Sequence, residues 1–160
     1  MERLLAEIAK TPGCSVFPTK GMPSLQPPHR LPDDLKRFYE LCGAVMLFEQ
    51  NDYHVLIVPP DRVVPANPLI VGQECEADIT ASWYIIGDDG NGDYLTIDLG
   101  PERLGRCYDS FRETHGLVGN CPIIARSFSE LLTSLHETRG DHWYWLRPEF
   151  VPIGDAYDDA

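Results

Sequence analysis

The sequence predicts an α+β domain in which an antiparallel sheet of about five or six strands carries helices packed on one side. Three observations support that class. Residues 83–99 have the pattern of two strands joined by a tight turn, residues 32–42 and 128–135 repeat apolar side chains at helical spacing, and short apolar runs lie between glycine and proline clusters. With 160 residues, 43% of them hydrophobic and 24% charged, the chain suits a single domain, residues 1–160.

The first 43 residues predict two helices separated by a loop. Residues 2–10 carry apolar side chains on one side and predict a short helix. Residues 11–30 hold five prolines, which exclude a helix and a central strand and predict a long surface loop. The second helix covers 32–42, because Pro32 suits a first turn and an apolar stripe recurs at i, i+3, i+4 and i+7. The stripe consists of Leu35, Phe38, Tyr39 and Cys42.

The next segment predicts a hairpin followed by irregular chain. Residues 45–49 and 53–58 are apolar runs on either side of Gln50-Asn51-Asp52, which indicates two strands near the middle of the sheet. Residues 69–71 are a possible short strand, and residues 73–82 a possible helical turn.

The stretch 83–99, WYIIGDDGNGDYLTIDL, is the strongest hairpin pattern in the chain. Residues 87–92 concentrate glycine, aspartate and asparagine, which favour a tight turn. After the turn the side chains alternate, with Leu95, Ile97 and Leu99 on one face. Tyr94, Thr96 and Asp98 lie on the other face.

The C-terminal third predicts two more strands and a helix. Residues 104–109 and 123–125 are short strand candidates, whereas residues 111–120 carry two glycines and give no clear element. Ser127 followed by Glu130 has the spacing of a capping box, so we expect a helix from there that ends near Gly140. The aromatic residues of 142–150 are expected to pack against the domain.

Charge is the most informative feature for function. The chain has 13 Lys and Arg against 25 Asp and Glu, a formal net charge of -12. No Lys or Arg lies between Arg62 and Arg103. Such a field disfavours nucleic acid and anionic membranes as partners and favours a basic protein. A face that merely keeps the protein soluble is the alternative. The predicted partner-binding residues are Glu74, Glu76, Asp78, Asp88, Asp89, Asp93 and Asp98.

The sequence gives little support for metal binding, and we expect no cofactor. Asp89, Asn91 and Asp93 match the first ligand positions of an EF-hand loop, but the sixth position is Tyr94 rather than Gly and the twelfth is Gly100 rather than Glu. The five cysteines form no CxxC pair, so we expect free thiols.

No recognised catalytic motif occurs, and we expect the protein not to be an enzyme. The sequence has no long apolar run and no signal-peptide pattern, which predicts a cytoplasmic protein.

The central hairpin and two flanking segments resemble the SUKH superfamily, which includes the Smi/Knr cell-wall assembly regulators and many bacterial immunity proteins. The similar segments span about residues 31–136 and include Leu31-Pro32 with its helix, and Ile124-Ala125 followed by Ser127-Phe128 and its helix. The hairpin residues that carry the resemblance are Trp83, Ile86, Gly87, Asp88, Gly92, Asp93 and Asp98.

This resemblance implies an immunity protein that binds and neutralises a cognate toxin, often a nuclease, by covering it. The acidic composition agrees with that expectation, because nuclease sites are basic. The alternative from the same resemblance is a regulatory scaffold protein of the cell-wall regulator type.

Overall fold

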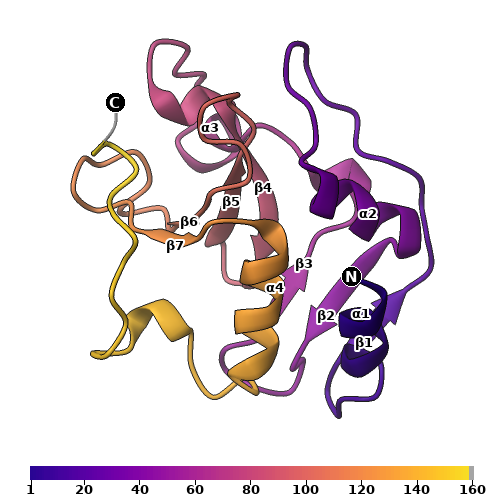
Figure 1. Cartoon of the computed structure of the whole chain (residues 1–160). Coiled ribbons are helices and arrows are strands. Elements are labelled where there is room, and N and C mark those ends of the chain that lie inside the picture. The colour runs from indigo at the N-terminus through magenta and orange to yellow at the C-terminus, as the bar shows by residue number, and fades with distance from the viewer. Residues whose placement is uncertain (159–160) are drawn as a thin grey trace.

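The computed structural model describes residues 1–158 and has one antiparallel sheet of seven strands, whose spatial order is the order of the chain (Figure 1). The α+β class is confirmed, with a strand count slightly above the predicted five or six. The strands are β1 (Ser15–Phe17), β2 (Ala44–Leu47), β3 (Val55–Ile57), β4 (Trp83–Asp88), β5 (Tyr94–Asp98), β6 (Cys107–Ser110) and β7 (Ile123–Ala125).

Strand β1 is the main element that the sequence did not indicate. It lies inside the proline-rich segment 11–30 and pairs with β2 alone, at the edge of the sheet. Pro12 and Pro18 lie just outside its three residues. Prolines are tolerated beside such a short edge strand, because one side of the strand needs no hydrogen-bonding partner.

Three helices form a layer on one side of the sheet: α1 (Glu2–Ile8), α2 (Asp33–Leu41) and α4 (Phe128–Glu137) (Figure 1). Arg37 of α2 forms an ion pair with Glu2 of α1. The Phe38 ring meets the Phe128 ring of α4 at a centroid distance of 4.9 Å. The apolar stripe predicted for the second helix is buried throughout, which confirms that this face builds the core.

The predicted strand at 69–71 is wrong. The structure has a short helix there, α3 (Ala66–Ile70), with an extended Pro65 before it. Pro68 lies within the helix, and its missing N–H costs little in a first turn, whereas a strand would lose a ladder hydrogen bond. The helical turn expected within 73–82 is the 3-10 helix η2 (Ile79–Ser82). Two further 3-10 turns are η1 (Pro60–Arg62) and η3 (Tyr144–Leu146).

The hairpin of β4 and β5 lies at the centre of the sheet, with Trp83 opposite Asp98 and Tyr84 opposite Ile97. Its predicted alternation is confirmed. A bulge between Ile85 and Gly87 shifts the register. A Cβ atom at Gly87 would lie 3.1 Å from the Cβ atom of Leu95, so a side chain there would crowd the neighbouring strand.

The predicted N-terminus of the last helix is confirmed in a modified form. The Ser127 hydroxyl accepts a hydrogen bond from the Glu130 N–H at 3.1 Å. The Glu130 carboxylate accepts in turn from the Arg126 N–H at 2.6 Å, one residue earlier than in the standard capping box. The cap therefore satisfies two backbone donors.

Candidate functional site

The predicted partner-binding acids form two groups, which lie at opposite ends of β4. Glu74, Glu76 and Asp78 precede the strand, whereas Asp88 is its last residue and Asp89 and Asp93 follow in the turn. Six residues at about 3.3 Å per step separate the two ends by roughly 16 Å. The sequence interval without Lys or Arg therefore does not fold into one compact patch.

The turn between β4 and β5 uses its aspartates to bind its own backbone. Gly90 and Gly92 have positive φ angles of 78° and 98°, which a residue with a side chain rarely adopts. The Asp89 carboxylate accepts from the Asn91 N–H at 2.8 Å and from the Asp93 N–H at 3.1 Å. Asp89 is 7% exposed, so this carboxylate mainly stabilises the turn.

The two other aspartates of the turn are only partly available to a partner. The Asp88 carboxylate accepts from the Gly90 N–H at 2.7 Å and pairs with Arg62. The half-buried Asp93 accepts from the Arg112 N–H at 2.9 Å, which ties the turn to the segment after β6. Both carboxylates still contribute negative charge at this end of the sheet.

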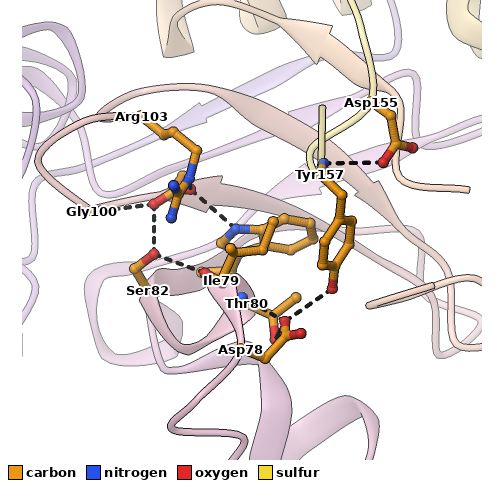
Figure 2. A network of polar contacts seen from close by, with 10 residues as sticks. Asp78, Ile79, Thr80, Ser82, Gly100, Arg103, Asp155 and Tyr157 are labelled. Atoms are coloured by element: carbon orange, nitrogen blue, oxygen red, sulfur yellow. Dashed lines mark hydrogen bonds and ion pairs between the residues drawn. The ribbon is translucent and has the colours of Figure 1, made fainter. Parts of the chain in front are cut away.

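Asp98 has no exposed surface and lies at the centre of a polar network, of which Figure 2 labels Ser82, Gly100 and Arg103. One carboxylate oxygen accepts from the Ser82 hydroxyl and from the Gly100 N–H, each at 2.7 Å. The other accepts from the Trp83 indole N–H at 3.1 Å and from Arg103 Nε at 2.9 Å. The network links the two ends of the central hairpin, so Asp98 stabilises the fold and cannot contact a partner in this structure.

Asp78 is also engaged within the molecule. Its Oδ1 accepts from the Thr80 hydroxyl at 2.7 Å and from the Tyr157 hydroxyl at 2.9 Å (Figure 2). Burial alone would raise the pKa of Asp78, but the hydrogen bonds from Thr80 and Tyr157 outweigh it and lower that pKa. The Tyr157 hydroxyl lies within hydrogen-bond distance of the Gly116 carbonyl as well, so the C-terminal segment covers this end of the sheet.

Glu74 and Glu76 are the two predicted residues that are exposed and have no partner within the described chain. Within residues 1–158, neither carboxylate has a hydrogen bond or an ion pair. Both line a cleft of about 150 Å³, together with the buried Asn67 and Thr80. Of the predicted set, this pair is the best placed to meet a basic group.

Sequence reasoning did not single out Asp109. It lies in β6 opposite Leu95 and is 7% exposed. Its carboxylate accepts from the Trp145 indole N–H at 2.8 Å and from the Phe111 N–H at 3.2 Å. Burial raises its pKa to about 7, and the charges of Asp93 and Asp89 act in the same direction. An acidic residue at a core-facing strand position was the signal that could have found it.

The aromatic tail packs as expected. Trp145 is 7% exposed and stacks against Trp143 at a centroid distance of 5.9 Å.

The thiols and the buried histidine show no activation for nucleophilic chemistry. All five cysteines are free. Burial raises the pKa of Cys42 to about 12 and that of Cys121 to about 11, the opposite of what a reactive thiolate needs. Burial also lowers the pKa of His115 to about 4.

Two further features of the structure bear on other functions. Among residues 1–158, no three His, Cys, Asp or Glu side chains come together in a way that could hold a metal ion. In the same part of the chain, every helix is too short or too polar to span a bilayer.

Comparisons with known proteins place the chain in a family. It is 49% identical over 158 residues to a protein of Bacillus subtilis (strain 168) named Immunity protein YokJ, an alignment that covers 99% of this chain and 96% of the relative. No solved structure matches the chain significantly. The model of the SMI1 / KNR4 family (SUKH-1) matches residues 28–134, in agreement with the resemblance seen at about 31–136. The chain therefore belongs to the SMI1 / KNR4 (SUKH-1) family.

Proposed function

We propose that this chain is an immunity protein, which binds and neutralises a cognate toxin in the cytoplasm without catalysis of its own. One observation carries the proposal. The chain is 49% identical to a relative named as an immunity protein, in an alignment that covers 99% of this chain. An inhibitor needs a stable surface rather than a reactive group, which agrees with the raised thiol pKa values of Cys42 and Cys121.

The partner is a toxin domain with a basic surface, and a nuclease fits best. A net charge of -12 accelerates association with a cation-rich surface and repels nucleic acid and anionic membranes. The exposed Glu74 and Glu76 can compete for side chains that would otherwise bind phosphate groups. Asp88 and Asp93 add charge at the other end of β4.

Co-expression with a candidate toxin domain, sought first among the products of neighbouring genes, tests the proposal. We expect growth to be rescued by the parent chain, and the purified pair to form a complex in which the toxin activity is lost. The control is a catalytically inactive toxin, which should bind the chain equally well. Rescue without a complex, or a toxin whose activity is unchanged by a large excess of the chain, would contradict the proposal. A regulatory scaffold would give neither rescue nor inhibition.

A further inference from the structure

A groove of about 440 Å³ opens between the end of β6, the segment 111–120 and the C-terminal segment 145–155. Its volume lies in the roughly 300–1,000 Å³ range of ligand pockets. Phe111, Trp145, Leu146 and Pro152 give it largely apolar walls, and Asp109 and Asp155 supply carboxylates. No Lys or Arg lines it, among the residues that the structure describes.

The Asp109 carboxylate is the polar group that distinguishes this groove from an ordinary surface depression. It is 93% buried, and its two hydrogen bonds come from the neutral donors of Trp145 and Phe111. Within the described chain it forms no ion pair. A buried carboxylate without a cation is costly, because burial penalises the charged form. A cation brought into the groove would relieve that cost.

The surrounding charges favour a cation as well. Asp155 is half-buried in the groove wall and accepts from the Cys121 N–H at 2.8 Å and from the Gly119 N–H at 3.2 Å. Burial is the main cause of the raised pKa of Asp109, and the charges of Asp93 and Asp89 act in the same direction. Another cleft of the molecule, of about 370 Å³, is lined by Arg103, Arg106 and Arg126 together with Glu102, Asp155 and Asp158. Its wall therefore mixes both signs of charge, whereas the charged side chains that line the Asp109 groove are carboxylates among the described residues.

We propose that this groove receives one lysine or arginine side chain of the partner protein, with its charged head at the Asp109 carboxylate and its aliphatic stem against Phe111 and Trp145. The inference rests on the proposed function and names the anchor point of the toxin on this chain. The Trp145 indole donates to Asp109 and so holds the carboxylate in place before the partner arrives. Long cationic side chains suit such a site, because their stems pack on apolar surface and their heads find a carboxylate.

A small probe tests the groove without the toxin. N-acetyl-arginine methylamide is titrated into the full chain, and the Trp145 indole N–H resonance is followed by NMR. Its neutral isostere, N-acetyl-citrulline methylamide, is the control. We expect a saturable shift with the arginine probe, little shift with the citrulline probe, and no shift in Asp109→Asn. Equal shifts with both probes, no shift with either, or a shift retained in Asp109→Asn would overturn the inference.

The second test of the groove measures the affinity of its variants for the toxin domain. Asp109→Asn should weaken binding by about thirtyfold or more, the lower end for removing one member of a buried charged pair. The second variant is Leu146→Lys, which leaves the core unchanged because Leu146 is 57% exposed at the groove. Its added amine can occupy the site in place of the partner's cation. It should weaken binding similarly. Met22→Lys, at a 44% exposed position in the loop between β1 and α2, adds the same charge elsewhere and serves as the control.

The outcomes separate this inference from the proposed function. A toxin that binds the parent, Asp109→Asn and Leu146→Lys equally well would overturn the groove and leave the immunity role intact. A toxin that does not bind the parent would overturn the immunity role, and the probe titration would still decide whether the groove takes a cation. A concentration-dependent dimer of the parent that Leu146→Lys abolishes would also overturn the inference, because a second copy would then occupy the groove.

Discussion

Replacing Asp98 by asparagine should destabilise the protein while leaving its surface charge pattern nearly unchanged. Each carboxylate oxygen accepts hydrogen bonds from two donors. In asparagine one of the two oxygens is replaced by an NH2 group, which must face two donors in either orientation of the side chain. Facing Ser82 and Gly100 is the less costly choice, because the Ser82 hydroxyl already lies 3.0 Å from the Ile79 carbonyl and can donate there. The Gly100 N–H then loses its acceptor, and Arg103 loses its counter-ion.

The magnitude follows from burial. Asp98 is 0% exposed and the Arg103 side chain is 16% exposed, so little water can replace the lost interactions. Removing one member of a buried pair costs about 3–5 kcal/mol. We expect the lower end of this range, about 3 kcal/mol, because asparagine retains one oxygen acceptor and the Ser82 hydroxyl can donate to the Ile79 carbonyl instead. For a domain of this size the melting temperature should then fall by roughly 6–12 °C.

Urea denaturation of the parent and of Asp98→Asn measures this loss. The control is Asp52→Asn, an exposed aspartate without a hydrogen bond in the described chain, which should change the free energy of unfolding by less than about 0.5 kcal/mol. Coincident denaturation curves for the parent and Asp98→Asn would refute the role given to the network. An unchanged stability combined with lost toxin binding would restore the interpretation of Asp98 as a partner contact.

Two further predictions concern the core and the pH dependence of stability. Trp83→Ala should cost about 3–5 kcal/mol, because the ring is 0% exposed and stacks on Tyr108 at a centroid distance of 4.0 Å. Trp83→Phe loses the indole N–H that donates to Asp98 and part of the ring, and it should cost less, about 1–3 kcal/mol, by the same denaturation assay. Burial raises the pKa of Asp109 from 3.8 to about 7, so the stability it contributes is present below about pH 4 and is lost as the pH rises to about 7. Burial lowers the pKa of His115 from 6.5 to about 4, so its contribution is present above pH 6.5 and is lost as the pH falls to about 4. The two effects oppose each other, and in Asp109→Asn the free energy of unfolding should rise with pH over this range by more than in the parent, whereas parallel pH profiles would contradict the assignment to Asp109.

The elements that the sequence predicted well are those in which local pattern and tertiary burial agree. Leu35 and Phe38 repeat at helical spacing and face the sheet, and the alternation of β5 places Leu95 and Ile97 in the core. Strand β1 carried no such pattern, because its three residues include the exposed Phe17 and Ser15 and owe their conformation to pairing with β2.

The candidate site was harder to predict because polar side chains at alternate strand positions usually face solvent. Thr96 and Asp98 alternate with core residues, yet both are 0% exposed. The second face of the sheet is covered here by segments without regular structure: the His115 ring meets Trp83 at a centroid distance of 5.6 Å, and Tyr157 closes over Gly116. No local sequence periodicity predicts that these irregular segments cover the sheet, because hydrogen bonds between residues far apart in the sequence hold them in place. The role of Asp109 also depends on a long-range contact, because its partner Trp145 lies 36 residues away.

The kinetics of toxin binding test the central claim most directly. Association and dissociation rates with the cognate toxin domain are measured at low and high salt for the parent and for a Glu74→Gln, Glu76→Gln double variant. An acidic surface that steers a basic toxin predicts association that slows steeply with salt. It also predicts slower association of the double variant at low salt, with dissociation nearly unchanged, because exposed charges act mainly on the encounter. Salt-independent association, with the same rates for the parent and the double variant, would contradict the account.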